Sequence, residues 1–154
     1  LKASLSIIDQ KPLLSSKTIQ STSKIIHEFN PDVVITHYFK DTHPEHRYVF
    51  EILNNAIIEN KIKKGKPNLI LCTNTYNNLG LNAAFEPNIY IDISKYIEKK
   101  NEAINQHKSQ PFQIWKDMAA RQSKFLSGRI SGVQHVEGFL QVPILGKLAN
   151  LSPF

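Results

Sequence analysis

"PDVVITHYFKDTHPEHR", residues 31–47, decides the fold class, because a strand gives way to a helix within it. Residues 32–36 form a continuous apolar run of the kind that a parallel sheet buries on both faces. Residues 37–43 form a loop at the carboxyl end of that strand. From Pro44 onward, apolar residues recur three and four positions apart, which predicts a helix that ends at Gly65 and Pro67.

The alternation of strands and helices continues on both sides of this stretch. Apolar runs predict further strands at residues 4–9, 68–73, 88–92 and 135–142. Helical spacing predicts helices at residues 15–29, 93–108 and 112–126. This order indicates an α/β fold with a mostly parallel sheet flanked by helices. Ligands of such sheets bind beyond the carboxyl ends of the strands, where the loop at residues 37–43 is expected.

Length and composition exclude several classes of protein. A chain of 154 residues is long enough for one domain, and 41% hydrophobic and 21% charged residues are ordinary globular values. No apolar run reaches the roughly 20 residues of a membrane span, and the first residues lack the pattern of a signal peptide. The single cysteine, Cys72, excludes an internal disulfide framework and fits a cytoplasmic location.

The formal net charge of +6 would suit an anionic partner such as nucleic acid. The lysines are scattered, however, and the densest group lies where the helix after Pro44 is expected to end, a place that suits cations. No recognised nucleic-acid motif accompanies the charge. A basic nucleic-acid-associated domain is therefore an alternative, while the main hypothesis expects neither nucleic acid nor a membrane as partner.

The histidines of "DTHPEHR", residues 41–47, have two interpretations. Pro44 suits the first helical position, which makes His43 the N-cap and puts His46 in the first turn. The positive end of the helix dipole disfavours imidazolium, and neutral imidazole is the form that binds a metal. Either these histidines are solvated residues of an ordinary helix start, or Asp41, His43 and His46 belong to a metal and acid–base site. A catalytic zinc ion takes three protein ligands, so two histidines do not complete such a site.

Three collinear segments between Pro31 and Val142 carry a resemblance to one known family. They are "PDVVITHYFKDTHPEHRYVFEIL", "YIDISKYIEKKNEAINQHKSQ" and "GVQHVEGFLQV". The first resembles the "PD-V-x-T-H…D-x-H-P-D-H" signature of the PIG-L/LmbE-like zinc-dependent N-deacetylases. The second resembles that family's "D-I-T…K…A…H-x-S-Q" helix, and the third resembles its closing "A-E-x-F" strand. The three together are more specific than any one of them.

The resemblance implies a Rossmann-like fold and hydrolysis of the N-acetyl group of an N-acetyl amino sugar or sugar conjugate, with Zn²⁺ as cofactor. It makes His46 a zinc ligand, and His43 the group that stabilises the tetrahedral oxyanion or protonates the leaving amine. Asp41 could orient His43 or line the pocket. Glu45 stands where the family commonly has Asp, and we expect it to point along the helix start without touching the metal.

The family's first motif, "H-P-D-D-E", supplies the other two zinc ligands and the catalytic base, and this sequence does not contain it. The resemblance therefore implies either a longer parent protein or a degenerate relative. We expect the former: residues 1–154 would be the C-terminal part of a single deacetylase domain, without its N-terminal strand and helix. The chain alone would then be inactive or nearly so. A non-catalytic binding protein on the same fold is the other alternative.

Two further histidines are candidates outside the motif. His107 ends the helix expected at residues 93–108; it could reach the substrate site, or lie on the surface where its charge suits a helix C-terminus. His37 follows the strand directly, and we expect it to pack in the loop rather than to act in the site. The sequence identifies neither the sugar nor the oligomeric state.

Overall fold

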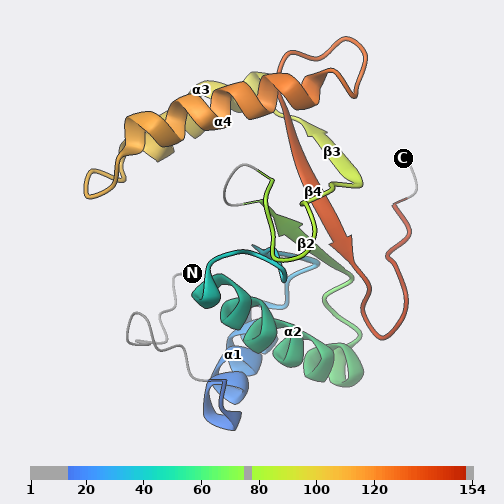
Figure 1. Ribbon diagram of the computed structural model, residues 1–154. Helices are drawn as coiled ribbons and strands as arrows, with labels where there is room; N and C mark the ends of the chain where they lie inside the picture. Colours follow the sequence, from blue (N-terminus) through green and yellow to red (C-terminus); the bar gives the residue numbers. More distant parts are fainter. Residues whose placement is uncertain (1–13, 75–77, 152–154) are drawn as a thin grey trace. The chain divides into compact units, whose positions relative to one another are not determined.

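The computed structural model describes residues 14–74 and 78–151, so the strand expected at residues 4–9 lies outside the described part of the chain. The strands form one sheet in the order β1-β2-β4-β3, which confirms the predicted Rossmann-like α/β fold. In chain order the elements are α1 (Ser16–Phe29), β1 (Val33–His37), α2 (Pro44–Lys64), β2 (Leu69–Thr73), β3 (Ile89–Asp92), the 3₁₀ turn η1 (Ser94–Tyr96), α3 (Ile97–Asn105), α4 (Phe112–Ser127) and β4 (Val136–Val142) (Figure 1).

The sheet is mixed in its strand directions. β1 and β2 are parallel, with Val33 opposite Leu69. β3 and β4 are antiparallel, with Ile89 opposite Phe139. Across the described ranges we find no helix with the length and apolar character that a bilayer crossing requires.

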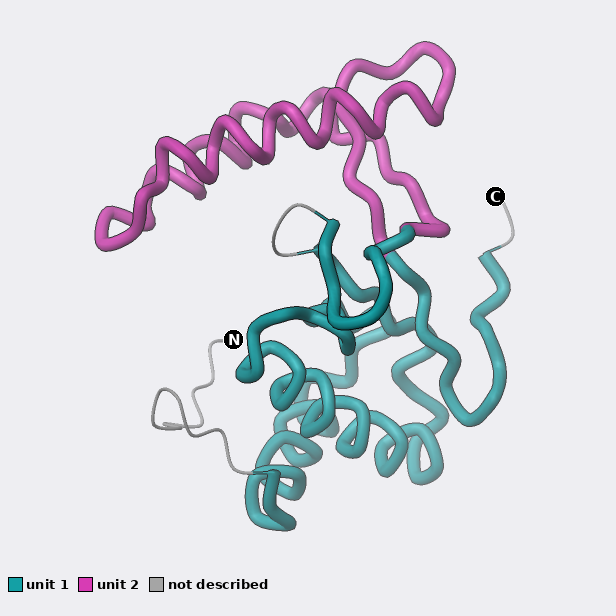
Figure 2. The backbone as a smooth tube through the Cα atoms, in the orientation of Figure 1, with its two compact units in different colours: residues 1–86, 140–154 teal, residues 87–139 magenta. Residues whose placement is uncertain are grey.

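The chain divides into two compact units, which Figure 2 shows in different colours. Unit 1 comprises residues 1–86 and 140–154, and unit 2 comprises residues 87–139. Unit 1 holds α1, α2, β1 and β2 together with the end of β4. Unit 2 holds β3, α3, α4 and the start of β4.

Local sequence signals set the ends of the two helices of unit 1. Ser15 caps α1, because its hydroxyl oxygen accepts from the backbone N–H of Thr18 at 3.2 Å. His43 is the N-cap of α2 and Pro44 its first residue, as the sequence predicted. α2 ends at Gly65, whose φ of 76° is the left-handed conformation that glycine adopts without strain. The predicted span of this helix is therefore confirmed.

α1 and α2 pack side by side against β1 and β2 (Figure 1). A buried polar contact also joins the helices: the side-chain amide of Asn60 donates to the carbonyl and hydroxyl oxygens of Ser23 at 3.0 and 2.9 Å. The apolar core between these elements consists of Ile26, Ala56, Ile57, Ile70 and Ile144.

β1 is less buried than its apolar run predicted. Val34 packs against the core beneath the helices, but Val33 and Ile35 are 46% and 58% exposed. The expectation that the sheet buries this strand on both faces is therefore wrong for the described part of the chain. The physical reason is that the two helices cover only the face that carries Val34, and that β1 lies at an edge of the sheet formed by the described strands.

Unit 2 is a helical hairpin on a short antiparallel ladder. α3 and α4 lie side by side (Figure 1). The helix expected at residues 93–108 begins instead as the turn η1 and ends at Asn105. Asp92, the last residue of β3, accepts from the backbone N–H of Ser94 at 2.9 Å and from its hydroxyl at 2.6 Å. These bonds lower the pKa of Asp92, because they favour its charged form.

Candidate active site

The predicted site lies on the loop between β1 and α2, at the carboxyl end of a parallel strand. A second segment of the chain holds this loop. Asp41 forms an isolated antiparallel bridge with Gly80, and the backbone N–H of Leu81 donates to the carbonyl of Lys40 at 2.7 Å. Asp41 is only 3% exposed as a result. The loop is therefore a fixed platform for the side chains at the start of α2.

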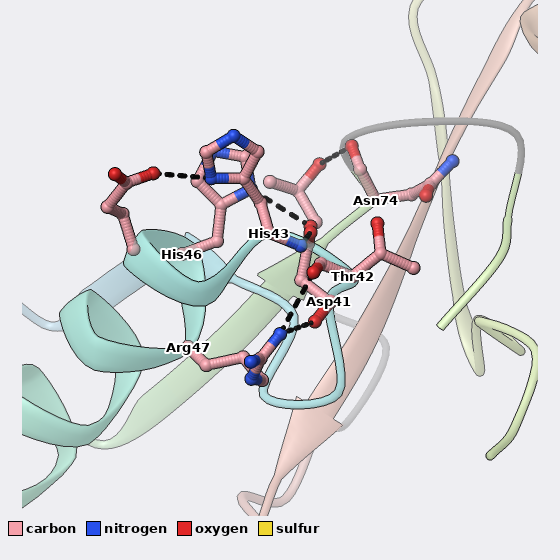
Figure 3. A network of polar contacts seen from close by, with 8 residues as sticks. Asp41, Thr42, His43, His46, Arg47 and Asn74 are labelled. Atoms are coloured by element: carbon pink, nitrogen blue, oxygen red, sulfur yellow. Dashed lines mark hydrogen bonds and ion pairs between the residues drawn. The ribbon is translucent and has the colours of Figure 1, made fainter. Parts of the chain in front are cut away.

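Asp41 shapes the entry into α2 through an Asx turn. Its Oδ1 accepts from the backbone N–H of His43 at 2.7 Å (Figure 3). Nη1 of Arg47 then donates to the carbonyl oxygens of Asp41 and Thr42, at 2.6 and 3.0 Å. The first turn of the helix thus binds back onto the loop that precedes it.

The other oxygen of Asp41 faces the ring of His46. Oδ2 lies 3.1 Å from Nδ1 of His46, within ion-pair distance although the contact lacks hydrogen-bond alignment. Histidines that bind metals commonly direct their second ring nitrogen at a carboxylate, which sets the tautomer and the ring orientation. The pair leaves Nε2 of His46 as the nitrogen that can bind a ligand.

His43 has a carboxylate partner of its own, and it is Glu45 rather than Asp41. Nδ1 of His43 lies 2.5 Å from Oε2 of Glu45, and the His43 side chain is half exposed. The sequence assigned no contact to Glu45 and left open whether Asp41 orients His43. In the structure Asp41 holds only the backbone of His43, while Glu45 holds its ring.

His37, the last residue of β1, stacks on His46. The two ring centroids are 4.2 Å apart and the ring planes differ by 13°. Burial, followed by the nearby His46, lowers the pKa of His37, and Asp41 opposes this shift. Nδ1 of His37 is buried and has no hydrogen-bond partner within the described residues. The sequence prediction of a loop-packing role missed this contact; the only signal for it was the position of His37 at the end of the strand.

The cluster fits one corner of a zinc site. His46 has the partner arrangement of a metal ligand, and an imidazole suits Zn²⁺. Over residues 14–74 and 78–151, however, no three side chains of His, Cys, Asp or Glu gather closely enough to hold a metal ion. The described residues therefore do not by themselves complete the set of three protein ligands that a catalytic zinc ion takes.

A hollow of about 360 Å³ lies beside the start of α2, and none of the three histidines of the cluster is among its lining residues. Its volume is within the range of small-molecule sites. Aromatic rings and two charged side chains form its wall: Phe39, Pro44, Arg47, Tyr48, Phe50 and Glu51.

His107 belongs to unit 2, whereas Asp41, His43 and His46 belong to unit 1. It follows the end of α3 and is exposed. Its backbone N–H donates to the carbonyl of Ile104 at 3.0 Å, as a residue that ends a helix commonly does. A role for His107 in the substrate site stays a prediction.

No family model matches the chain. Among solved structures, the chain is similar to GalB, the 4-carboxy-2-hydroxymuconate hydratase from Pseudomonas putida KT2440, with a TM-score of 0.74 and 17% identity; the match covers 95% of this chain and 66% of that chain. It is also similar to the conserved protein TT1542 from Thermus thermophilus, with a TM-score of 0.69 and 19% identity over 90% of this chain and 64% of that one.

A third similar structure is the N,N′-diacetylchitobiose deacetylase from Pyrococcus horikoshii. The TM-score is 0.64 and the identity 22%, over 91% of this chain and 55% of that one. At these identities the likenesses show the fold alone, an α/β fold that a hydratase and a deacetylase both use. The chain spans between 55% and 66% of the length of the three proteins.

Proposed function

We propose that the protein is a zinc-dependent N-deacetylase of the PIG-L/LmbE-like family, which hydrolyses the N-acetyl group of an N-acetyl amino sugar or sugar conjugate. One observation carries the proposal: two imidazoles at the start of α2 each face their own carboxylate, His46 with Asp41 and His43 with Glu45. Ordinary solvated histidines at a helix start need no such partners. A deacetylase is among the proteins that share this fold, which is in keeping with the proposal.

His46 and Asp41 form the metal-binding half of the proposed site. His46 would hold the ion through Nε2, while the buried carboxylate of Asp41 fixes the ring from the Nδ1 side. When bound, zinc would polarise the amide carbonyl and lower the pKa of a water molecule. Two more ligands and a carboxylate base are needed, and we propose that they lie in a preceding segment, so that residues 1–154 form the C-terminal part of a single deacetylase domain in the cytoplasm.

His43 and Glu45 form the acid–base half. An amide has a poor leaving group, so its nitrogen must be protonated as the carbon–nitrogen bond breaks. His43 is exposed enough to meet a substrate, and because Glu45 lies on its Nδ1 side, Nε2 is the nitrogen that would face the substrate. There Nε2 can donate a proton to the amine or a hydrogen bond to the oxyanion.

The experiment uses the longest reading frame that contains this chain, assayed for acetate release from N-acetylglucosamine and an N-acetylated disaccharide. His46→Ala should abolish zinc binding or weaken it greatly. His43→Ala should leave zinc binding nearly intact and lower kcat roughly 100- to 10,000-fold, the usual contribution of a general acid. His27→Ala is the matched control, because His27 is an exposed histidine on α1.

Deacetylation that survives both site substitutions would contradict the proposed residues. Zinc-dependent deacetylation by the 154-residue chain alone would contradict the part of the proposal that puts the remaining ligands upstream. A reading frame without a further zinc-ligand motif, and without acetate release, would favour the alternative of a non-catalytic binding protein on the same fold.

A further inference from the structure

We propose that His37 is a positioning residue, which holds the ring of the zinc ligand His46 by stacking on it and is not itself a ligand of the same ion. The inference rests on the proposed function. It goes further by giving a role to a histidine outside the "DTHPEHR" motif.

The contact joins two separate elements. His37 is the last residue of β1, and His46 lies in the first turn of α2. Their centroids are 4.2 Å apart with an angle of 13° between the planes, which is a face-to-face stack. The strand end is anchored by the parallel ladder, where His37 lies opposite Thr73. His37 is therefore a rigid surface against which the ring of His46 rests.

The same geometry excludes joint ligation in this arrangement. A histidine nitrogen binds zinc through a lone pair in the ring plane, at about 2.0–2.1 Å. The planes of His37 and His46 are nearly parallel, so an ion in the plane of one ring lies well off the plane of the other. The two nitrogens cannot both direct lone pairs at one ion. His46 is the ring that has the carboxylate partner of a ligand.

Besides the tilted ring of His43, whose centroid lies 4.8 Å away, two contacts at right angles to each other hold the His46 ring. Asp41 meets its Nδ1 edge, and His37 covers a face. The edge contact opposes rotation of the ring within its plane, and the face contact opposes tilting. A ligand held in both senses loses less freedom when an ion binds, which is how preorganised sites gain affinity.

The test compares three substitutions in the longest reading frame that contains this chain. His37→Phe keeps a flat ring and removes the nitrogens, His37→Leu fills similar volume without a ring, and His37→Gln keeps a polar group. In the metal-free chain, the ring protons of His46 should show an upfield ring-current shift by NMR in wild type and in H37F. The shift should be lost in H37L and H37Q.

Zinc affinity, measured by chelator competition, and the visible spectrum of the Co²⁺-loaded protein form the second readout. Both use the longest reading frame that contains this chain, because the described residues do not complete a zinc site. H37F should bind zinc within about threefold of wild type, and H37L and H37Q should lose roughly 10- to 100-fold, as other residues that orient a ligand do. Thermal unfolding of each variant separates this effect from general destabilisation, because a merely structural role would move Tm without changing the Co²⁺ spectrum.

Three results would overturn the inference. An equal loss of zinc affinity in H37F and H37L would make a nitrogen of His37 a ligand. Zinc affinity in H37L equal to wild type, or the absence of a ring-current shift in the wild-type protein, would show that the stack does not hold the ring. If the wild-type protein expressed from the longest reading frame shows the shift but binds no zinc, this would instead contradict the proposed function and leave the stack established.

Discussion

Oδ2 of Asp41 lies 3.1 Å from Nδ1 of His46, while Oδ1 of the same carboxylate accepts from the backbone N–H of His43 at 2.7 Å. One buried side chain thus controls both the turn that begins α2 and the ring of the proposed zinc ligand. The two roles differ in their chemistry. The turn needs only an oxygen atom that accepts a hydrogen bond, whereas the interaction with the imidazole ring needs a negative charge.

Two substitutions of Asp41 should distinguish its role in the turn from its role beside His46. Asp41→Asn retains an acceptor for the N–H of His43, so the fold should persist, but zinc affinity should fall roughly 10- to 100-fold, because the charge that faces His46 is lost. Asp41→Ala should lose both and also lower the free energy of unfolding by about 1–2 kcal/mol. Zinc competition titrations and urea unfolding measure these effects. Equal zinc affinity in D41N and wild type would show that the carboxylate charge is irrelevant.

Because Gly80 has no side chain, its backbone can lie close to the loop that carries Asp41. A Cβ atom at this position would lie 2.6 Å from the carbonyl oxygen of Ala83 and 2.8 Å from that of Lys40. Backbone atoms cannot move aside cheaply, so Gly80→Ala should lower the free energy of unfolding by about 1–3 kcal/mol.

Gly128→Ala is the matched control for Gly80, because a Cβ there meets only the carbonyl of Phe125 at 3.4 Å, with φ at −62°. This variant should be neutral or slightly more stable than wild type, since alanine restricts the unfolded chain. Urea unfolding followed by circular dichroism compares the two, and equal midpoints would refute the steric account of Gly80.

Replacing Asn60, which contacts Ser23, should lower the free energy of unfolding by more than the small size of the side chain indicates. Asn60 is 3% exposed, and Nδ2 donates to Ser23 and to the carbonyl of Ala56. Asn60→Ala would leave buried acceptors without their donor and should cost about 1–3 kcal/mol of stability. Asn55→Ala, on the exposed side of the same helix, should change stability by less than about 0.5 kcal/mol. Similar unfolding midpoints for both variants would contradict this prediction.

Cys72 should be inert in the folded chain. It is fully buried, and burial raises the pKa of its thiol from 9.0 to about 12, because the thiolate is poorly solvated there. A disulfide reagent at pH 8 should therefore react quickly only after unfolding in guanidinium. The unfolded chain ionises first, so this group's contribution to stability is complete below pH 9 and is lost between pH 9 and about 12. Rapid labelling of the native protein would contradict the prediction.

The elements around the site could be predicted from the sequence because local signals specify them. Pro44 and Gly65 bound α2 at the predicted positions, since a fixed φ suits the first turn and a left-handed residue ends the last. The same local reasoning made His43 the N-cap. It was wrong about the burial of Val33 and Ile35, because an apolar run does not reveal whether a strand lies at the edge of a sheet.

The partners within the site could not be predicted in this way. Asp41 and Glu45 lie at equal distance from His43 in the sequence, so spacing alone does not say which carboxylate meets which ring. The path of the loop decides it, and that path depends on the bridge between Asp41 and Gly80. The contact of His37 with His46 could not be predicted for the same reason, because it joins a strand end to a helix.

The sequence by itself determined the order of strands and helices, the ends of α2 and the presence of imidazoles and carboxylates at one strand end. These follow from backbone propensities and from the alternation of apolar residues, which act over a few positions. Only the tertiary structure decided that Asp41 faces His46, that Glu45 faces His43 and that His37 stacks on His46. Such pairings depend on ångström-scale distances between elements, which arise when β1, α2 and the Gly80 segment pack together.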